Sequence, residues 1–186
     1  MYDTDAWPVI QAADYQRYTA GRRYVTTVVI HDAEYPEIEG GARGVARYFQ
    51  HPDKPSSAHI CVDDKEIIQS VMDNDIAWAA GHHANQIGVH IEIIGYGKQT
   101  LAEWLDWYSV AALALASDAA AQYCLKYNLP PIRLTVPQII AGNKGICGHV
   151  DFTNAYHESD HQDPGPNFPW DYFMRSVNQF YQARSQ

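Results

Sequence analysis

The chain has 186 residues, of which 46% are hydrophobic and 19% are charged. That length fits one domain with a sizeable core, and the composition is typical of a folded globular protein. The formal net charge of −9 argues against non-specific binding to nucleic acid and against docking on anionic lipid, because both depend on positive charge. No apolar run reaches the roughly 18 residues that a membrane-spanning helix needs, so we expect no membrane insertion.

The cysteines argue against a disulfide-rich protein, and the start of the chain argues against a secretion signal. Cys61, Cys124 and Cys147 are widely spaced and odd in number, which argues against a disulfide framework or a structural zinc knuckle. We expect Cys61 and Cys124 to be buried, since a free cysteine packs like a small hydrophobic residue. The acidic start lacks the basic and apolar regions of a secretion signal. Synthesis as a soluble protein in the cytoplasm is therefore expected, and action on a cell wall would require release by another component.

Strand-like and helix-like patterns alternate along the chain, which predicts a layered α/β domain. Residues 1–23 are expected to form a poorly regular lead-in of the domain whose body spans residues 24–186. Runs rich in β-branched and apolar residues predict strands at 24–31, 57–62, 66–71, 87–94 and 132–136. Helices are expected at 42–50, 101–127 and 169–183, whereas 137–148 and 153–167 are expected to be mainly loop.

The longest predicted helix, 101–127, is defined by apolar side chains at three- and four-residue spacing. One buried stripe on its surface is expected to contain Trp104, Trp107, Tyr108, Ala111, Leu115 and Ala119. Pro130 and Pro131 follow the helix and prevent its continuation.

Three polar residues at the ends of ordered segments are candidate metal ligands. His31 ends the first apolar strand, His149 follows Gly148, and Asp163 lies between His161 and a run of prolines and glycine. Two histidines and a carboxylate are a known catalytic zinc set. Each residue also has an ordinary structural explanation, and sequence spacing alone does not join the three.

Glu92 is unusual because it lies inside the apolar strand predicted at 87–94. Strand alternation places His90 and Glu92 on one face of the sheet and Val89, Ile91 and Ile93 on the other. Either the first face is exposed to water, or Glu92 is a general base that points into a catalytic site.

Several segments in order resemble the type-2 zinc N-acetylmuramoyl-L-alanine amidases. That family includes phage endolysin amidases, cell-wall-recycling amidases and peptidoglycan recognition proteins. The resemblance extends from about Val28 to about Phe173. It is carried by Val29-Ile30-His31, Ser57-Ala58-His59-Ile60, Ala77-Trp78-Ala79-Ala80-Gly81, Ile91-Glu92-Ile93-Ile94-Gly95, Gly148-His149-Val150-Asp151 and Asp163-Pro164-Gly165-Pro166-Asn167-Phe168-Pro169-Trp170.

The resemblance implies a central mixed β-sheet flanked by helices, with one Zn²⁺ per chain at the sheet edge. His31, His149 and Asp163 match the zinc ligands, and Glu92 matches the catalytic glutamate of the recycling-amidase branch. His161 matches a position, usually Lys or His, that supports the transition state. The implied reaction is hydrolysis of the amide between N-acetylmuramic acid and L-alanine of peptidoglycan.

Departures from the family pattern affect the expected substrate contacts. Ala79 stands where relatives carry a histidine that lines the groove, and His82 or His83 is a candidate replacement. Ala58 stands where other branches carry a catalytic tyrosine, so Glu92 is expected to be the base. With Asp163 as third ligand, Cys147 is not needed. Candidate substrate-binding residues are Trp78, Asn85, Tyr96, Trp170 and Tyr156, while Asp32, Asp151 and Asn85 are candidates for orienting the ligands.

Three functions remain open on these residues. The favoured one is the catalytic domain of a phage endolysin, acting as a monomer with further domains flanking it in the native protein. A cytosolic recycling amidase acting on anhydro-muropeptides would share every catalytic residue. A non-catalytic peptidoglycan recognition module is disfavoured because all three ligand positions and Glu92 are present. His90 has no assigned role.

Overall fold

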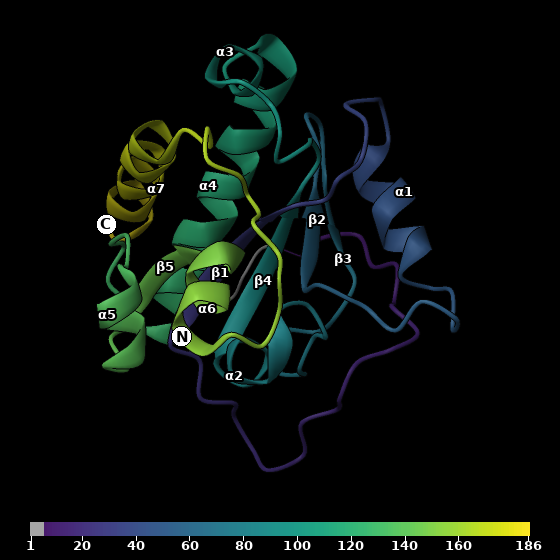
Figure 1. The fold of residues 1–186 in the computed structure, drawn as a ribbon, viewed down its shortest axis with the longest axis vertical. Helices are drawn as coiled ribbons and strands as arrows, with labels where there is room; N and C mark the ends of the chain where they lie inside the picture. The colour runs from purple at the N-terminus through teal and green to yellow at the C-terminus, as the bar shows by residue number, and fades with distance from the viewer. Residues whose placement is uncertain (1–5) are drawn as a thin grey trace.

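A mixed five-stranded sheet with strand order β3-β2-β4-β1-β5 runs through the centre of the protein (Figure 1). This computed structural model describes residues 6–186. The strands are β1 (Thr27–Asp32), β2 (Ile60–Val62), β3 (Ile67–Gln69), β4 (Gly88–Ile93) and β5 (Gly145–Gly148). Neighbouring strands are parallel except for the antiparallel pair of β2 and β3. The predicted mixed sheet flanked by helices is confirmed.

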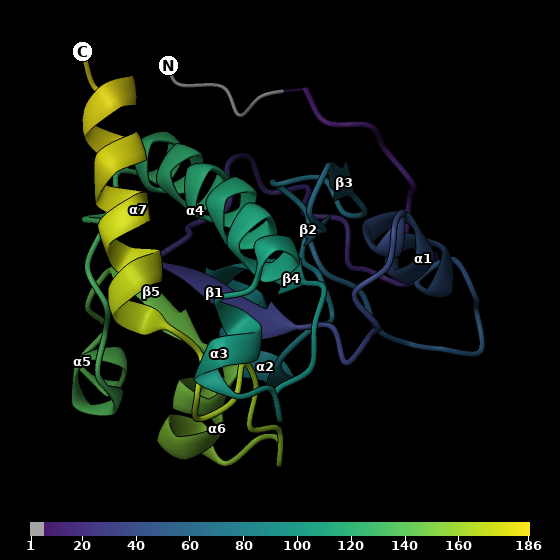
Figure 2. The same ribbon diagram turned by 90° about the horizontal axis from the view of Figure 1, so that it is seen from above.

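Helices cover the sheet unequally on its two faces (Figure 2). α4 and α7 pack together over one face, where the largest hydrophobic core lies. A smaller core joins α2, α5 and α6 to the other face. The helices are α1 (Gly41–Tyr48), α2 (Gly81–Ile87), α3 (Leu101–Trp104), α4 (Trp107–Tyr127), α5 (Val136–Ile140), α6 (His149–Tyr156) and α7 (Trp170–Arg184).

Alternation along β4 separates apolar from polar side chains, as predicted. Val89, Ile91 and Ile93 are fully buried in the core beneath α4 and α7. His90 and Glu92 point to the opposite face. In the parallel register of β1 and β4, Glu92 lies opposite His31, and His90 lies opposite Val29, two residues earlier in β1. This register brings a histidine and a glutamate from distant parts of the chain side by side.

The predicted helix over 101–127 is two helices, α3 and α4, separated by Leu105 and Asp106. The break occurs because Asp106 is extended and its Oδ1 accepts a hydrogen bond from the Ser109 backbone N–H at 2.9 Å, which starts α4 as an N-cap. The expected buried stripe is consequently wrong at Trp107, which is 77% exposed, whereas Trp104 is fully buried.

The segment before the C-terminal helix contains more regular structure than expected. Residues 132–136 contribute only an isolated bridge between Arg133 and Ile146, so the strand predicted there is wrong. The fifth strand is instead β5, and α6 occupies part of the region expected to be loop. Gly145 and Gly148 bound β5, and such a short glycine-flanked run carries little strand signal.

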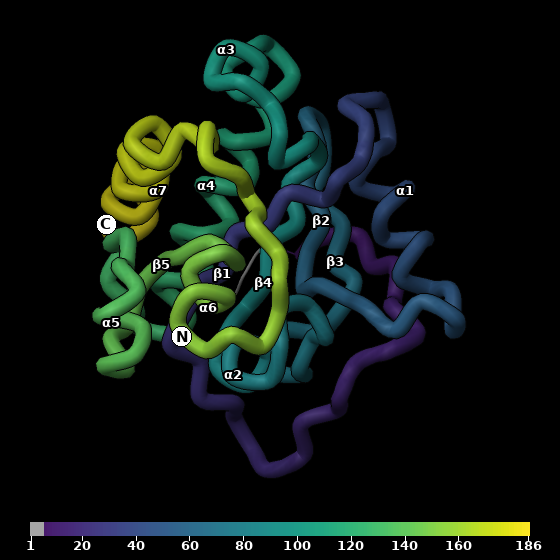
Figure 3. The backbone as a smooth tube through the Cα atoms, in the orientation of Figure 1, coloured from purple at the N-terminus to yellow at the C-terminus, as the bar shows by residue number. Residues whose placement is uncertain are grey.

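Residues 6–23 contain no helix or extended strand, and they run along the β3 edge of the sheet (Figure 3). The backbone N–H of Ile10 donates to the Gln69 carbonyl at 2.9 Å, and that of Ala12 donates to the Ser70 carbonyl at 2.9 Å. The lead-in thereby provides hydrogen-bond donors for backbone carbonyls at the edge of the sheet. Within the described part of the chain, no helix has the length and apolar character required to cross a bilayer.

We predict that Asp106→Ala lowers the free energy of unfolding by about 1 kcal/mol, the usual cost of losing an N-cap. The reason is the loss of the Asp106 hydrogen bond at the start of α4, the helix that covers the main core. Urea unfolding of Asp106→Ala and of a control, Asp53→Ala at an exposed aspartate, measures the effect. Equal midpoints for the two variants would contradict the capping role.

Candidate active site

Three side chains from separate elements meet at the edge of the sheet. His31 lies at the end of β1, His149 is the first residue of α6, and Asp163 lies in the segment between α6 and α7. His31 Nδ1 is 2.8 Å from Asp163 Oδ2, and His149 Nδ1 is 3.0 Å from Asp163 Oδ1. One atom from each residue lies within 4.8 Å of the others, so the three could hold a metal ion.

His149 is positioned by the short connection from β5 to α6. Asp151 accepts a hydrogen bond from the Gly148 backbone N–H at 2.7 Å, which fixes the first turn of α6. The guanidinium of Arg133 forms an ion pair with the same carboxylate at 2.7 Å. Asp151 therefore orients the helix that carries His149 without contacting a candidate ligand itself.

Asp163 lies in the segment between α6 and α7, which runs across the front of β4 in Figure 3. The Val150 backbone N–H donates to the Asp163 carbonyl at 2.9 Å, which ties this segment to the start of α6. Gly165 has a φ of 88° and lies so close to Gly97 that an added Cβ would be 2.0 Å from the Gly97 carbonyl oxygen. Only glycine fits at that position.

The central contacts are close but are not hydrogen bonds. Both carboxylate oxygens of Asp163 and Nδ1 of His149 are buried without a hydrogen-bond partner. Burial acts to raise the pKa of Asp163, but its contacts with His149 and His31 outweigh burial and hold that pKa well below its usual range. Buried nitrogen and oxygen atoms from three residues that approach one another without hydrogen-bond partners are available to bind a metal ion.

The second nitrogen of each imidazole is also held. His31 Nε2 is 3.0 Å from His90 Nδ1, and His149 Nε2 is 3.0 Å from Ser159 Oγ. The Ser159 hydroxyl is in turn 2.6 Å from Thr153 Oγ1. Both histidines thus turn Nδ1 toward Asp163. Nothing in the sequence pattern singled out Ser159 or Thr153, because they follow no motif and lie together only in space.

Glu92 lies beside the His31 side of this cluster. Its Oε1 is 4.0 Å from His31 Nδ1, and its side chain is 13% exposed. Burial, followed by the nearby carboxylates of Asp163 and Asp32, raises the pKa of Glu92 well above its usual value. The alternative that this face of β4 is simply exposed to water is wrong, because the neighbouring His90 is completely buried.

Asp32 adds a third carboxylate on the same side. Its Oδ1 accepts a hydrogen bond from the Glu34 backbone N–H at 3.1 Å. Burial and then the charge of Asp163 raise the pKa of Asp32 to about 7. Asp32 therefore shapes the local charge, and its own hydrogen bond goes to the backbone of the neighbouring turn.

His161 lies at the rim of the cluster, with 64% of its side chain exposed. Its ring stacks on that of His149 with centroids 4.8 Å apart, and its Nδ1 is 3.6 Å from Asp163 Oδ1. The ring therefore faces the solvent-accessible side of the three candidate ligands, where a substrate would approach.

A cleft of about 390 Å³ opens over the cluster. Its floor contains His31, Glu92, His149, His161 and Asp163, and its wall is formed mainly by side chains of α1 and the preceding turn. The aromatic residues of that wall are Tyr35, Tyr48 and Phe49. Sequence reasoning missed these three. The amphipathic pattern of α1 was a signal for Tyr48 and Phe49 at the end of that helix, whereas Tyr35 lies before the helix and had no such signal.

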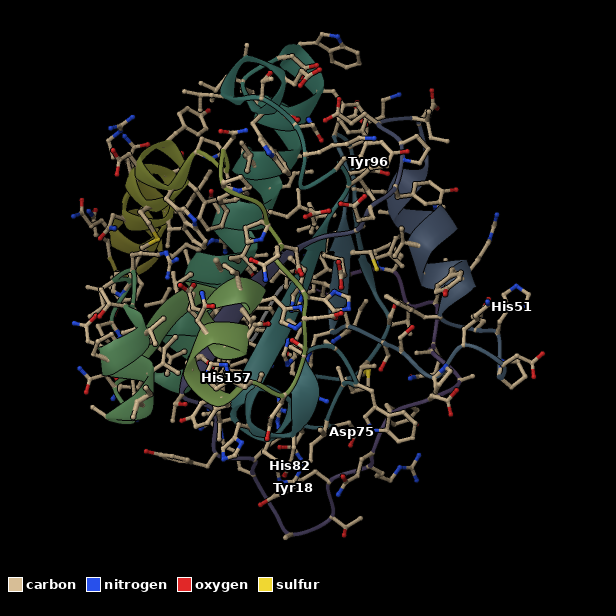
Figure 4. All side chains as sticks on the ribbon, viewed as in Figure 1. Tyr18, His51, Asp75, His82, Tyr96 and His157 are labelled. Carbon is tan, nitrogen blue, oxygen red and sulfur yellow. The ribbon has the colours of Figure 1, made fainter. Side chains whose placement is uncertain are left out.

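The proposed substrate-binding residues lie outside this cleft. None of Trp78, Asn85, Tyr96, Trp170 and Tyr156 is among its lining residues. The Asn85 side-chain oxygen accepts hydrogen bonds from the Ala79 and Ala80 backbone N–H groups, so it stabilises a turn. The Trp170 ring packs against the Arg133 guanidinium, whose Cζ is 3.9 Å from the ring centroid. Tyr96 lies beside the loop after β4, far from α2 (Figure 4).

The two histidines considered as replacements at position 79 also lie elsewhere. His82 is the second residue of α2 and lies at the lower end of the view in Figure 4. His83 forms an ion pair with Glu158 at 2.7 Å and stacks on Tyr156 with centroids 4.0 Å apart. Ala79 itself lines the cleft, so its small side chain leaves this part of the wall open.

The three cysteines are free and buried, which confirms the expectation for Cys61 and Cys124. Burial raises the pKa of the Cys147 thiol, and its Sγ donates weakly to the Val28 carbonyl at 3.9 Å. A protonated thiol turned toward the backbone is a poor metal ligand, which agrees with the expectation that Cys147 is not part of the cluster.

Comparison with known proteins finds similarity to an N-acetylmuramoyl-L-alanine amidase. N-acetylmuramoyl-L-alanine amidase XlyA from Bacillus subtilis (strain 168) is 32% identical over 87 residues, which cover 42% of this chain and 29% of XlyA. The chain therefore matches less than a third of the length of that curated relative.

Solved structures share the fold at low sequence identity. The Staphylococcus aureus hydrolase AmiA, in complex with its ligand, superposes with a TM-score of 0.68 at 20% identity, covering 94% of this chain and 86% of AmiA. The catalytic domain of XlyA gives a TM-score of 0.56 at 22% identity, covering 91% of this chain and 98% of that domain. A sequence model of the family described as N-acetylmuramoyl-L-alanine amidase matches residues 21–166. The chain belongs to the N-acetylmuramoyl-L-alanine amidase family.

Proposed function

We propose that this chain hydrolyses the amide bond between N-acetylmuramic acid and L-alanine of peptidoglycan, with one Zn²⁺ held by His31, His149 and Asp163. The observation that carries the proposal is the convergence of these three side chains, with unpartnered buried atoms, at the floor of an open cleft. Family membership supports the reaction class.

The donor set fits zinc. Two imidazole nitrogens and one carboxylate oxygen are typical of catalytic zinc, which keeps a further position open. When bound, zinc supplies a Lewis acid that activates water and polarises the substrate carbonyl. Burial, and then repulsion from Asp163 and Asp32, raise the pKa of Glu92, and a dication bound among these carboxylates would offset the repulsion.

Glu92 and His161 perform the proton and charge steps in this mechanism. Glu92 takes a proton from the attacking water while the oxygen of that water bonds to the amide carbon. The same carboxyl delivers that proton to the amide nitrogen as the carbon–nitrogen bond breaks, which releases the lactyl carboxylate and the amine of L-alanine. His161, at the solvent side of the ligands, donates a hydrogen bond to the developing oxyanion when it is protonated.

The wall of the cleft supplies binding rather than chemistry. Tyr35, Tyr48 and Phe49 present aromatic faces on one side of the candidate catalytic groups. Such faces suit the apolar sides of sugar rings and peptide side chains.

We propose further that the activity serves host lysis, as the catalytic domain of a phage endolysin. The support is the likeness of fold to an endolysin from Bacillus subtilis, with a TM-score of 0.56 at 19% identity, covering 92% of this chain. The small share of XlyA that matches agrees with a catalytic domain that is joined to other domains.

Purified peptidoglycan digested with this protein should yield new L-alanine amino ends and no new reducing ends. The amino ends should not form when a chelator removes the metal, and they should form again when zinc is added back and refills the site. Mass spectrometry and end-group counts on intact wall and on small anhydro-muropeptides measure this. Cleavage of muropeptides alone would contradict the endolysin role and favour recycling, and no cleavage of either substrate would contradict the amidase.

Glu92→Gln should retain zinc but lose turnover by about 100-fold or more, because general acid–base catalysis contributes roughly that much. Zinc content and turnover are measured on the same preparation. The control is Glu39→Gln, an exposed glutamate paired with Lys65 on the surface. Turnover that survives in Glu92→Gln would remove Glu92 from the mechanism.

A further inference from the structure

His90 is a completely buried histidine on the active-site face of β4 that the proposed chemistry does not use. Its backbone is held by His59, because the His90 N–H donates to His59 Nδ1 at 3.0 Å and the His90 carbonyl accepts from the His59 backbone N–H at 3.1 Å. Its ring therefore has little freedom, and its Nδ1 lies 3.0 Å from His31 Nε2.

We propose that His90 is a positioning residue that accepts the Nε2 proton of His31 and so directs the Nδ1 lone pair of His31 at the metal. The inference rests on the proposed metal site at His31, His149 and Asp163.

The proton positions on the rings of His31 and His90 depend on each other. A neutral imidazole carries one N–H, and a ligand nitrogen carries none. If His31 Nδ1 binds the metal, its proton must be on Nε2, and the partner that Nε2 meets at 3.0 Å is His90 Nδ1. His90 Nδ1 must then be an acceptor, which places the His90 proton on Nε2.

The surroundings of His90 hold its ring in place. The ring is completely buried and stacks on the ring of His59, with centroids 5.6 Å apart. His90 Nε2 is buried without a hydrogen-bond partner, and a Cβ added at Gly88 would be 3.1 Å from it. Glycine at position 88 thus leaves room for the ring edge that this arrangement requires.

A neutral acceptor also suits the charge of the site. Metal-binding histidines commonly donate their second N–H to a carboxylate or a backbone carbonyl. Here Asp32, Glu92 and Asp163 already place three carboxylates near His31. A fourth carboxylate would raise the pKa of Glu92 further, whereas the imidazole of His90 orients His31 without adding charge.

The first test compares two variants of similar size that differ in the acceptor. The amide oxygen of Asn in His90→Asn can take the place of Nδ1, whereas His90→Leu removes the acceptor. Zinc affinity, measured by competition with a chelator, should fall about 10- to 100-fold in His90→Leu, the usual effect of losing such a partner. It should be largely restored in His90→Asn.

The control variant is Ile91→Val, the next residue of β4, which is buried on the opposite face of the sheet. It perturbs the packing of the same strand and should keep the zinc affinity of the original protein. Equal affinities in His90→Leu, His90→Asn and the original protein would overturn the role of His90. Failure of the original protein to bind zinc would instead refute the proposed metal site.

The second test needs no substitution. Proton–nitrogen correlation spectra of the imidazole rings distinguish the two neutral tautomers in the zinc-loaded protein. We expect both His31 and His90 to carry their proton on Nε2. A His90 proton on Nδ1 would overturn the proposal, because that nitrogen could not accept from His31.

Discussion

The active-site architecture depends on Asp163, whose carboxylate lies between two imidazoles. His31 comes from the first strand of the sheet and His149 from the start of α6, and their Nδ1 atoms approach opposite oxygens of Asp163 at 2.8 and 3.0 Å. Several structural features serve this convergence. The Gly165–Gly97 approach, the Val150–Asp163 hydrogen bond and the capping of α6 by Asp151 all fix the segments that carry these side chains.

The parallel register of β1 and β4 adds Glu92, the proposed acid–base group, to this arrangement. Because Glu92 lies opposite His31, a glutamate in an otherwise apolar strand stands next to the candidate ligands. The same alternation buries His90 beneath His31, and the opposite side chains of β4 fill the core under α4. One strand therefore supplies core packing on one face and the side chains of the proposed catalytic and positioning groups on the other.

The sequence predicted the parts of the fold with strong periodicity, including the strands around Val29 and Ile91. The three candidate ligands were joined by resemblance to a family, since their spacing carried no geometric information. β5 and α6 were missed because their short segments owe their structure to tertiary contacts, such as the Arg133–Asp151 ion pair. The cleft wall was missed because residues far apart in sequence meet there only after folding, and Ser159 was missed because it belongs to no sequence motif.

The central claim is that two imidazole nitrogens and a carboxylate oxygen hold one zinc ion. X-ray absorption at the zinc edge of the loaded protein tests it most directly. We predict a first shell of nitrogen and oxygen only, at about 2.0–2.2 Å, with the multiple-scattering signal of two imidazoles. A sulfur shell at about 2.3 Å, which would implicate a cysteine such as Cys147, or a signal of fewer than two imidazoles would contradict the account.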